Sequence, residues 1–195
     1  LQVFTCRSTL STKLIDVIFP PGLQSLTLEN GLYNLDQIKC LDSLEFLKLG
    51  DFEQPLEGNL PKNLKSLVLG ETFNQKLEEI LLPQTLQHLD VGMTYNHSLD
   101  HVNFPEILSS LTFGDKFNQS FETVKLPNLQ DLSLGEDFAQ QISFTNLRSL
   151  RFTDGFNKSL ETILPQKLKR LSLGNDFNQI LDQTELPNNL ESLSF

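Results

Sequence analysis

The chain has 195 residues, 38% of them hydrophobic, and a formal net charge of −10, which predicts one globular domain with a substantial core. The negative charge argues against nucleic acid and anionic membranes as partners, because binding either requires clustered Lys and Arg. The sequence contains neither a run of eighteen apolar residues nor a signal-peptide pattern.

The pattern L-x-x-L-x-L-G recurs along the chain with a period close to 21 residues. Its first leucines, separated by steps of 18 to 22 residues, are Leu23, Leu44, Leu64, Leu86, Leu108, Leu129, Leu147, Leu168 and Leu190. Leu1, Phe4 and Cys6 fit the same spacing, which gives about ten repeats, here called rungs. A fixed period of this length predicts a solenoid. Residues 1–195 would form one such domain, with the first two rungs degenerate and the last truncated.

Each rung is expected to contribute one short strand. In LKSLVLG, Leu67 and Leu69 alternate with Ser66 and Val68, and this period of two is typical of a strand with one buried face. Stacking the rungs places these strands in a parallel sheet, about 4.8 Å apart. The sequence therefore predicts that each leucine packs on its equivalents in the neighbouring rungs.

A glycine follows the strand, and an arc then ends at a proline. At Gly70, a residue without Cβ would let the chain leave the strand sharply, whereas Thr153 at the equivalent position predicts a remodelled turn. The arc FNQKLEEILLP has apolar spacings that match no helix beyond one turn. The predicted fold is a repeat solenoid, a leucine-rich-repeat-like right-handed coil with one parallel strand per rung. Its convex arcs are loops or 3₁₀ turns, with little regular helix.

Two columns, meaning equivalent positions in successive rungs, dominate the arcs. An aromatic column predicts a stacked spine of Phe73, Tyr95, Phe117, Phe138, Phe156 and Phe177. The next position holds Asn74, Asn96, Asn118, Asn157 and Asn178, interrupted by Ala139. A buried amide without partners costs about 1 to 3 kcal/mol, so we interpret these asparagines as a structural ladder between rungs. A row of ligand-binding amides is the less favoured alternative.

The stretches LGETFNQKLEEILLP, LGNDFNQILDQTELP and GDKFNQSFETVKLP resemble the FNIP or FGxxFN type of leucine-rich repeat, known from social amoebae and giant DNA viruses. The resemblance covers nearly the whole chain. It implies a leucine-rich-repeat solenoid with an interaction role and no assigned enzymatic activity. The chain departs from the pattern at the shortened turn of residues 49–56, at Ala139 and in the first two rungs.

Few residues suggest chemistry. His97, Asp100 and His101 lack a further ligand of matching spacing and fall on an arc not expected to be helical, so we predict no metal and no cofactor. Asp90 and Asp131, two rungs apart, would lie about 10 Å from each other, near the upper limit for an inverting glycosidase pair. A flat sheet provides no concave pocket for such a reaction. A hydrolase on the strand face is therefore the least supported function.

The outward positions of the strands are mostly small, which suits a crowded parallel sheet. The bulky or charged exceptions are the candidate partner-binding residues, namely Phe46, Lys48, Val68, His88, Asp90, Arg148, Arg151 and Arg170. A solvated face with no ligand is the simpler alternative. We expect a protein partner to dock here, because side chains displayed from a rigid sheet form the extended surface that solenoids use.

An acidic column follows the glycine and contains Asp51, Glu71, Asp115, Glu136 and Asp154. Such a ridge favours solubility and discourages stacking of like molecules. Calcium binding is the alternative, although a calcium site needs several oxygens that converge on one point.

The most favoured function is a non-enzymatic protein–protein interaction module. The first alternative is a self-assembly element, since neither end carries a polar capping repeat and exposed sheet edges would form a homodimer. Light scattering distinguishes the two.

Two groups of residues predict the cellular location. Asn96, Asn118 and Asn157 are formal glycosylation acceptors, and glycans on amides buried in a ladder would block folding. Cys6 and Cys40 fall on leucine columns, where we expect small core residues that remain thiols. Both expectations favour an intracellular, cytoplasmic protein.

Overall fold

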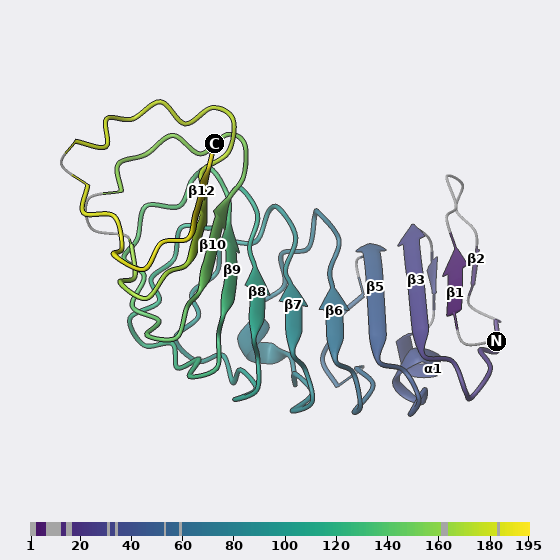
Figure 1. The fold of residues 1–195 in the computed structure, drawn as a ribbon. Helices are drawn as coiled ribbons and strands as arrows, with labels where there is room; N and C mark the ends of the chain where they lie inside the picture. The colour runs from purple at the N-terminus through teal and green to yellow at the C-terminus, as the bar shows by residue number, and fades with distance from the viewer. Residues whose placement is uncertain are drawn as a thin grey trace.

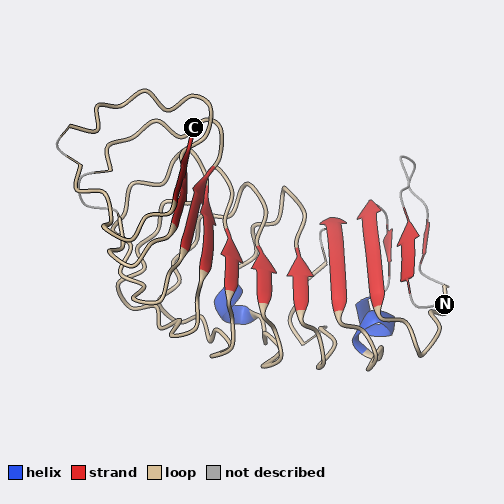
Figure 2. Cartoon of the chain, viewed as in Figure 1, coloured by secondary structure: helices blue, strands red, loops and turns tan. Residues whose placement is uncertain are grey.

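The chain coils into a solenoid whose strands lie side by side along its length (Figure 1). The structure, a computed structural model, describes residues 3–6, 13–14, 17–30, 32–33, 35–52, 54–58, 60–160, 164–182 and 184–195. Within these ranges one face carries the strands, and loops form almost all of the rest (Figure 2).

Ten described strands form the main sheet, in the order β1-β3-β5-β6-β7-β8-β9-β10-β11-β12. Their bounds are β1 Val3–Cys6, β3 Ser25–Asn30, β5 Phe46–Asp51, β6 Ser66–Val68, β7 His88–Asp90, β8 Ser110–Thr112, β9 Asp131–Leu134, β10 Ser149–Phe152, β11 Arg170–Ser172 and β12 Ser192–Ser194. A separate parallel pair joins β2 (Lys13–Leu14) to β4 (Leu32–Tyr33). The prediction of one short parallel strand per rung is confirmed.

The leucine columns set the register of the sheet. Leu67 pairs with Leu89, Leu89 with Leu111, and Leu111 with Leu132, and all four side chains are buried. Because side chains alternate along a strand, a slip of one residue would expose the entire column. Leucine burial therefore fixes which residues face outward.

The aromatic column forms a stacked spine beside the sheet. The ring centroids of Phe73 and Tyr95 lie 6.2 Å apart with planes at 11°, and those of Phe117 and Phe138 lie 6.2 Å apart with planes at 5°. This spacing exceeds the separation of about 4.8 Å between adjacent strands. The rungs therefore diverge toward the spine, and the sheet lies on the inner side of the curve.

Regular helix is rare among the described residues, as the sequence predicts. The two helical segments are α1 (Leu35–Lys39) and the 3₁₀ turn η1 (Leu77–Glu79). Helix α1 buries Leu35 and Ile38, which lie three residues apart and so share one helical face. No helix in the described part of the chain has the length and apolarity needed to cross a bilayer.

The glycine column is required mainly by the close approach of neighbouring rungs. A Cβ on Gly50 would lie 1.5 Å from the carbonyl oxygen of Glu29, and one on Gly70 would lie 2.5 Å from that of Gly50. The expected backbone freedom is needed at Gly92 and Gly174, where φ is 81° and 79°. The rungs thus pack backbone against backbone beyond the end of each strand.

The prediction that Cys40 occupies the core is wrong. Cys40 is an exposed free thiol, and Leu41 is the buried residue. The prediction assumed a constant spacing of four residues before the first leucine of the strand, as between Leu82 and Leu86. This rung instead has a spacing of three, and Leu41 therefore takes the core position. The side chain of Cys6 lies outside the described residues.

Candidate protein-binding surface

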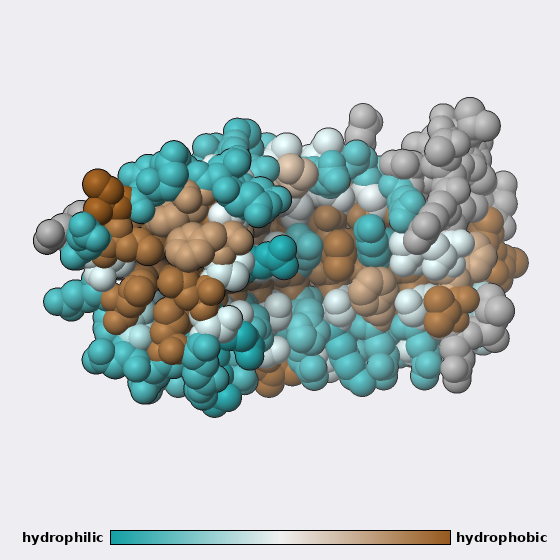
Figure 3. Space-filling view, turned by 45° about the horizontal axis from the view of Figure 1, so that its top comes forward, coloured by the Kyte–Doolittle hydropathy of each residue, from teal (hydrophilic) through white to brown (hydrophobic). Residues whose placement is uncertain are grey.

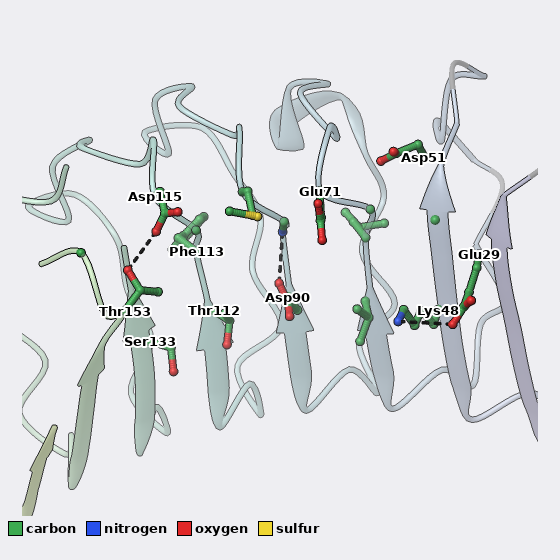
Figure 4. Close-up of a pocket in the computed structure, with 18 of the residues that line it drawn as sticks. Glu29, Lys48, Asp51, Glu71, Asp90, Thr112, Phe113, Asp115, Ser133 and Thr153 are labelled. Carbon is green, nitrogen blue, oxygen red and sulfur yellow. Dashed lines mark hydrogen bonds and ion pairs between the residues drawn. The ribbon is translucent and has the colours of Figure 1, made fainter. Parts of the chain in front are cut away.

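A groove of about 780 Å³ crosses the carboxyl ends of the strands above the glycine column (Figure 4). One wall consists of outward strand residues, namely Lys48, Val68, Asp90, Thr112 and Ser133. The other wall consists of residues that follow the glycine position, namely Asp51, Glu71, Met93, Asp115 and Asp154. Four glycines, Gly50, Gly70, Gly92 and Gly114, lie between the walls. We call this feature the glycine groove.

The two walls correspond to two columns that the sequence presents as separate features. Since glycine has no side chain, nothing projects between the outward strand column and the acidic column. Leu69 and Phe113 also line the groove, and Met93 is 43% exposed. In Figure 3, apolar atoms are visible along the middle of this face between two rows of hydrophilic atoms. The groove therefore combines apolar surface with acidic edges.

A residue other than glycine stands near each end of the groove. In β3, Glu29 takes the position opposite Gly50, and its Oε1 lies 4.0 Å from the Nζ of Lys48. In the rung of β10, Thr153 replaces glycine, and its Oγ1 donates a 2.8 Å hydrogen bond to Oδ1 of Asp115, two rungs away. Both contacts are drawn in Figure 4. The open stretch therefore coincides with the run of glycines.

The lining of the groove is strongly negative. Six carboxylates, Glu29, Asp51, Glu71, Asp90, Asp115 and Asp154, face one ammonium, that of Lys48. Asp51 Oδ1 accepts hydrogen bonds from the backbone N–H and the hydroxyl of Thr72, at 3.1 and 2.8 Å. These bonds fix the Asp51 carboxylate at the edge. A cleft lined by one sign of charge concentrates the opposite charge.

Asp90 is the carboxylate that projects from the strand wall. Burial raises the pKa of Asp90 above its usual value, and this increase is partly offset by a 3.1 Å hydrogen bond from the Gly92 N–H and by the charge of Lys48. Burial removes water from the Asp90 carboxylate and so disfavours its charged form. A cation placed in the groove would stabilise that charged form in place of the lost water.

The structure divides the candidate partner-binding residues of the sequence into two groups. Lys48, Val68 and Asp90 line the glycine groove. Phe46 and His88 lie in the other outward column, two positions earlier in their strands, and both pair with Ser66. Phe46 is half-buried and His88 is exposed. These residues form one continuous face over β5 to β7.

The arginines lie farther along the sheet. Arg148, Arg151 and Arg170 are exposed at or beside β10 and β11. Arg170 Nη2 lies 3.5 Å from Oδ1 of Asp131, across the intervening strand β10. The strand face therefore has a basic region beyond the end of the acidic groove.

The asparagine column bridges neighbouring rungs, but its side chains are more exposed than expected. Asn96 Oδ1 accepts the N–H of Asn118 at 2.9 Å, and Asn118 Oδ1 accepts the N–H of Ala139 at 3.0 Å. Asn157 Oδ1 accepts the N–H of Asn178 at 3.1 Å. Asn74, Asn96, Asn157 and Asn178 are exposed and Asn118 is half-buried, so the burial premise of the location argument is wrong.

A glutamine column directly after the asparagine was missed. Gln119 Nε2 donates to Asn96 Oδ1 at 2.9 Å, and Gln140 Nε2 donates to Asn118 Oδ1 at 3.1 Å. Gln75 similarly donates to the backbone oxygen of Gln54 at 2.7 Å. The recurrent FNQ triplet was the available signal. The side-chain oxygens of Asn96, Asn118 and Asn157 are each shared by a backbone and a side-chain donor of the next rung.

The weaker candidates for chemistry make ordinary surface contacts. His97 Nε2 lies 2.8 Å from the backbone oxygen of Asn74. Hydrogen bonds from the hydroxyls of Thr123 and Ser98 lower the pKa of Asp100. Across the described ranges, no group of three or more His, Cys, Asp or Glu is placed to hold a metal ion.

The chain matches a family of repeat proteins and is similar to a solved structure. The FNIP Repeat family matches residues 52–93, 95–137 and 156–195, more than half of the chain. The crystal structure of CroV588, a circular LRR protein, superposes with a TM-score of 0.60 at 28% sequence identity. That alignment covers 96% of this chain and 35% of CroV588, so the chain spans about a third of that protein. No curated protein matches the chain significantly. The repeats, the parallel solenoid and the family match together establish that the chain belongs to the FNIP repeat family.

Proposed function

We propose that the chain is a non-enzymatic protein-interaction module, and that its partner docks on the glycine groove and on the strand face beside it. The observation that carries this proposal is the groove itself, which gathers residues from β3 to β10 on one rigid sheet. Membership of a repeat family with a leucine-rich-repeat-like solenoid supports it, since solenoids use such extended surfaces.

The test is capture of partners by the chain and by variants of its two faces. Val68→Trp places a large side chain in the groove, whereas Leu81→Trp makes a matched aliphatic-to-Trp change at a position that is 73% exposed outside the groove. We expect Leu81→Trp to retain every captured partner and Val68→Trp to lose at least one.

A second variant tests the strand face and carries Phe46→Ser, His88→Ser, Arg151→Ser and Arg170→Ser. We expect this variant to bind the captured partner at least tenfold more weakly than the wild type. If it and Val68→Trp both bind all partners with unchanged affinity, the proposal is wrong.

A second candidate function is self-assembly through β12 and the arc between β11 and β12. Apolar side chains are exposed there, including Ile180 at 80% and Phe195 at 60%, with Leu186 and Leu193 each at 36%. Figure 3 shows apolar atoms gathered at one end of the molecule. Strand β12 pairs with β11 on one side only. We propose that a second copy covers this surface.

Light scattering over a range of concentrations tests self-assembly. We expect the wild type to form a dimer as its concentration rises and the Leu193→Lys, Phe195→Lys variant to remain monomeric. A wild type that stays monomeric at all concentrations would exclude this function for residues 1–195.

We also propose an intracellular site of action, which the exposed position of the Cys40 thiol supports. An exposed free thiol persists in a reducing compartment. Alkylation of Cys40 in intact cells without prior reduction is the expected result. Cys40 that reacts only after reduction would contradict the proposal.

A further inference from the structure

We propose that the glycine groove binds an extended polypeptide segment that carries Lys or Arg at every second position. This inference rests on the proposed interaction function and specifies the chemistry of the partner. It also selects the groove, rather than the rest of the strand face, as the primary contact.

The shape of the groove suits an extended chain. It crosses the strands along the long axis of the solenoid, over successive rungs from β5 to β8, with Thr153 near one end and Glu29 near the other. Rungs separated by about 4.8 Å at the strands and more at the arcs give an open length of roughly 20 to 25 Å. An extended peptide advances about 3.3 Å per residue, so roughly seven residues would fill this length.

The carboxylates are arranged one to a rung. Asp51, Glu71, Asp90 and Asp115 belong to the rungs of β5, β6, β7 and β8, respectively. In the β7 rung, Met93 takes the position of the acidic column, and Asp90 supplies the carboxylate from the opposite wall instead (Figure 4). Every glycine-bearing rung from β5 to β8 therefore presents one negative charge to the groove.

The spacing of successive rungs at the level of the spine is close to that of alternate residues in an extended peptide. Beside the acidic wall, successive spine rings are 6.2 to 6.3 Å apart, as measured for Phe73 to Tyr95 and Tyr95 to Phe117. In an extended chain, side chains on the same face recur about every 6.6 Å. One basic side chain can therefore meet one carboxylate in each rung, whereas consecutive basic residues would point half of their charges away.

Apolar lining favours basic side chains over bare metal ions. Val68 and Met93 are accessible between the charged positions and can contact the aliphatic stems of Lys or Arg. A calcium site instead requires several oxygens at about 2.3 to 2.6 Å from one point. The groove provides single carboxylates from separate rungs, and no candidate metal cluster occurs among the residues described.

The experiment uses fluorescein-labelled (Lys-Thr)₄ and a block peptide, Lys₄-Thr₄, of the same composition. Binding to the full chain is measured by fluorescence anisotropy at low salt, with and without calcium. The groove variant carries Asp51→Asn, Glu71→Gln and Asp90→Asn, which preserve side-chain size. The control variant carries Glu79→Gln, Glu106→Gln and Glu122→Gln, three exposed positions outside the groove lining. Both variants lose the same formal charge.

We expect saturable binding of (Lys-Thr)₄ to the wild type and at least fivefold weaker binding of the block peptide. The groove variant should bind (Lys-Thr)₄ at least tenfold more weakly, and the control variant less than twofold more weakly. Val68→Trp, which leaves all charges in place, should also weaken binding at least tenfold. If the groove variant fails to fold, the binding of (Lys-Thr)₄ by Val68→Trp tests the inference in its place.

Four results would overturn the inference. The first is no saturable binding of (Lys-Thr)₄ by the wild type. The second is an equal loss in the groove and control variants, which would indicate attraction to net charge alone. The third is equal binding of the two peptides, and the fourth is displacement of (Lys-Thr)₄ by calcium at a concentration equal to that of the groove carboxylates. Loss of a captured partner in Val68→Trp, with peptide binding unchanged in the groove variant, would defeat this inference while leaving the proposed function standing.

Discussion

The same leucine columns run through all the rungs from β6 to β10, but the arcs of neighbouring rungs contact each other differently in two regions. The first region comprises the rungs of β6 to β9, and the second is the step from the rung of β9 to the rung of β10. In the former, the rings of Tyr95 and Phe138 stack on the two sides of Phe117, at 6.3 and 6.2 Å. At the step to β10, no ring contact joins Phe138 to Phe156, although both lie in the described part of the chain. The spine is thus continuous before this step and resumes after it.

Three changes of sequence coincide at the step. Nine positions separate Phe138 from Leu147, against twelve between Phe117 and Leu129, so the arc is three residues shorter. Ala139 replaces the asparagine of the ladder, and Thr153 replaces the glycine. The shorter arc changes the path of the chain beside the sheet, which accounts for the loss of ring stacking there.

The sheet is nevertheless uninterrupted at this step. Strands β9 and β10 pair in register from Asp131 with Ser149 to Leu134 with Phe152. Lys158 Nζ also donates to the backbone oxygen of Asp137 at 2.5 Å. The leucine columns and the backbone pairing therefore suffice to stack two rungs, and the spine and ladder add local stability where they are present.

The largest effect is expected from removing a ring of the continuous spine. Phe117→Ala should lower the free energy of unfolding by about 3 to 5 kcal/mol, because a fully buried ring is lost and a cavity remains. Phe156 has the Phe152 ring against it, as Phe117 has Phe113, but along the spine it stacks on Phe177 alone, so Phe156→Ala should cost about 0.5 to 1.5 kcal/mol less. Urea unfolding of both variants measures the difference. A greater loss at Phe156 would contradict the comparison.

The next effect concerns the glycine column. Gly70→Ala should cost about 3 kcal/mol, because its Cβ would overlap the backbone of Gly50 and Asp51. Gly22→Ala is the matched control, since a Cβ at Gly22 would meet nothing within 4 Å, and its effect should stay within about 0.5 kcal/mol. Equal urea midpoints for the two variants would show that the rungs can separate at Gly70 without cost.

Much of the fold could be predicted because the repeat determines it. Each leucine of LKSLVLG has an equivalent in the next rung, so period and alternation together specify the strands, their register and the buried face. Where the spacing varies by one residue, the same reasoning fails. Leu41 replaces Cys40 in the core for this reason.

The groove could not be predicted from its separate columns. The sequence identifies the outward strand residues and the acidic residues, but whether they face each other depends on the path of the chain through each glycine. The hydrogen bond from Thr153 to Asp115 likewise spans the rung of β9, whose residue at this position, Gly135, has no side chain to block it. Contacts of this kind depend on curvature, which no single rung encodes.

The ladder should contribute a smaller effect than the spine. Asn118→Ala removes the acceptor of the Ala139 N–H and of Gln140, and should cost about 1 to 2 kcal/mol. Ala139→Asn should add less than about 0.5 kcal/mol, because the shortened arc displaces the next rung from bonding distance. Urea unfolding checks both variants. A clear gain in Ala139→Asn would show that the step tolerates a ladder after all.

The smallest effect is expected at Asp90 and depends on pH. Burial raises the pKa of Asp90 above its ordinary 3.8, so the folded state binds this proton more tightly than the unfolded state. The stability contributed by Asp90 is therefore greatest below pH 3.8 and declines as pH rises through the folded pKa. Asp90→Asn keeps an oxygen for the Gly92 N–H and avoids burying a charge.

This variant should be more stable than the wild type at pH 7, and the difference should vanish at pH 3. Glu79→Gln, an exposed position, reports the effect of net charge alone at both pH values. If Asp90→Asn is instead less stable at pH 7, then Lys48 and the Gly92 N–H outweigh the cost of burial. The Asp90 carboxylate would in that case already be compensated within the protein. If the wild type is instead less stable than Asp90→Asn at pH 7 and equally stable at pH 3, the charged Asp90 carboxylate destabilises the folded protein. A basic side chain that enters the groove would then gain more binding free energy at Asp90 than at a fully hydrated carboxylate.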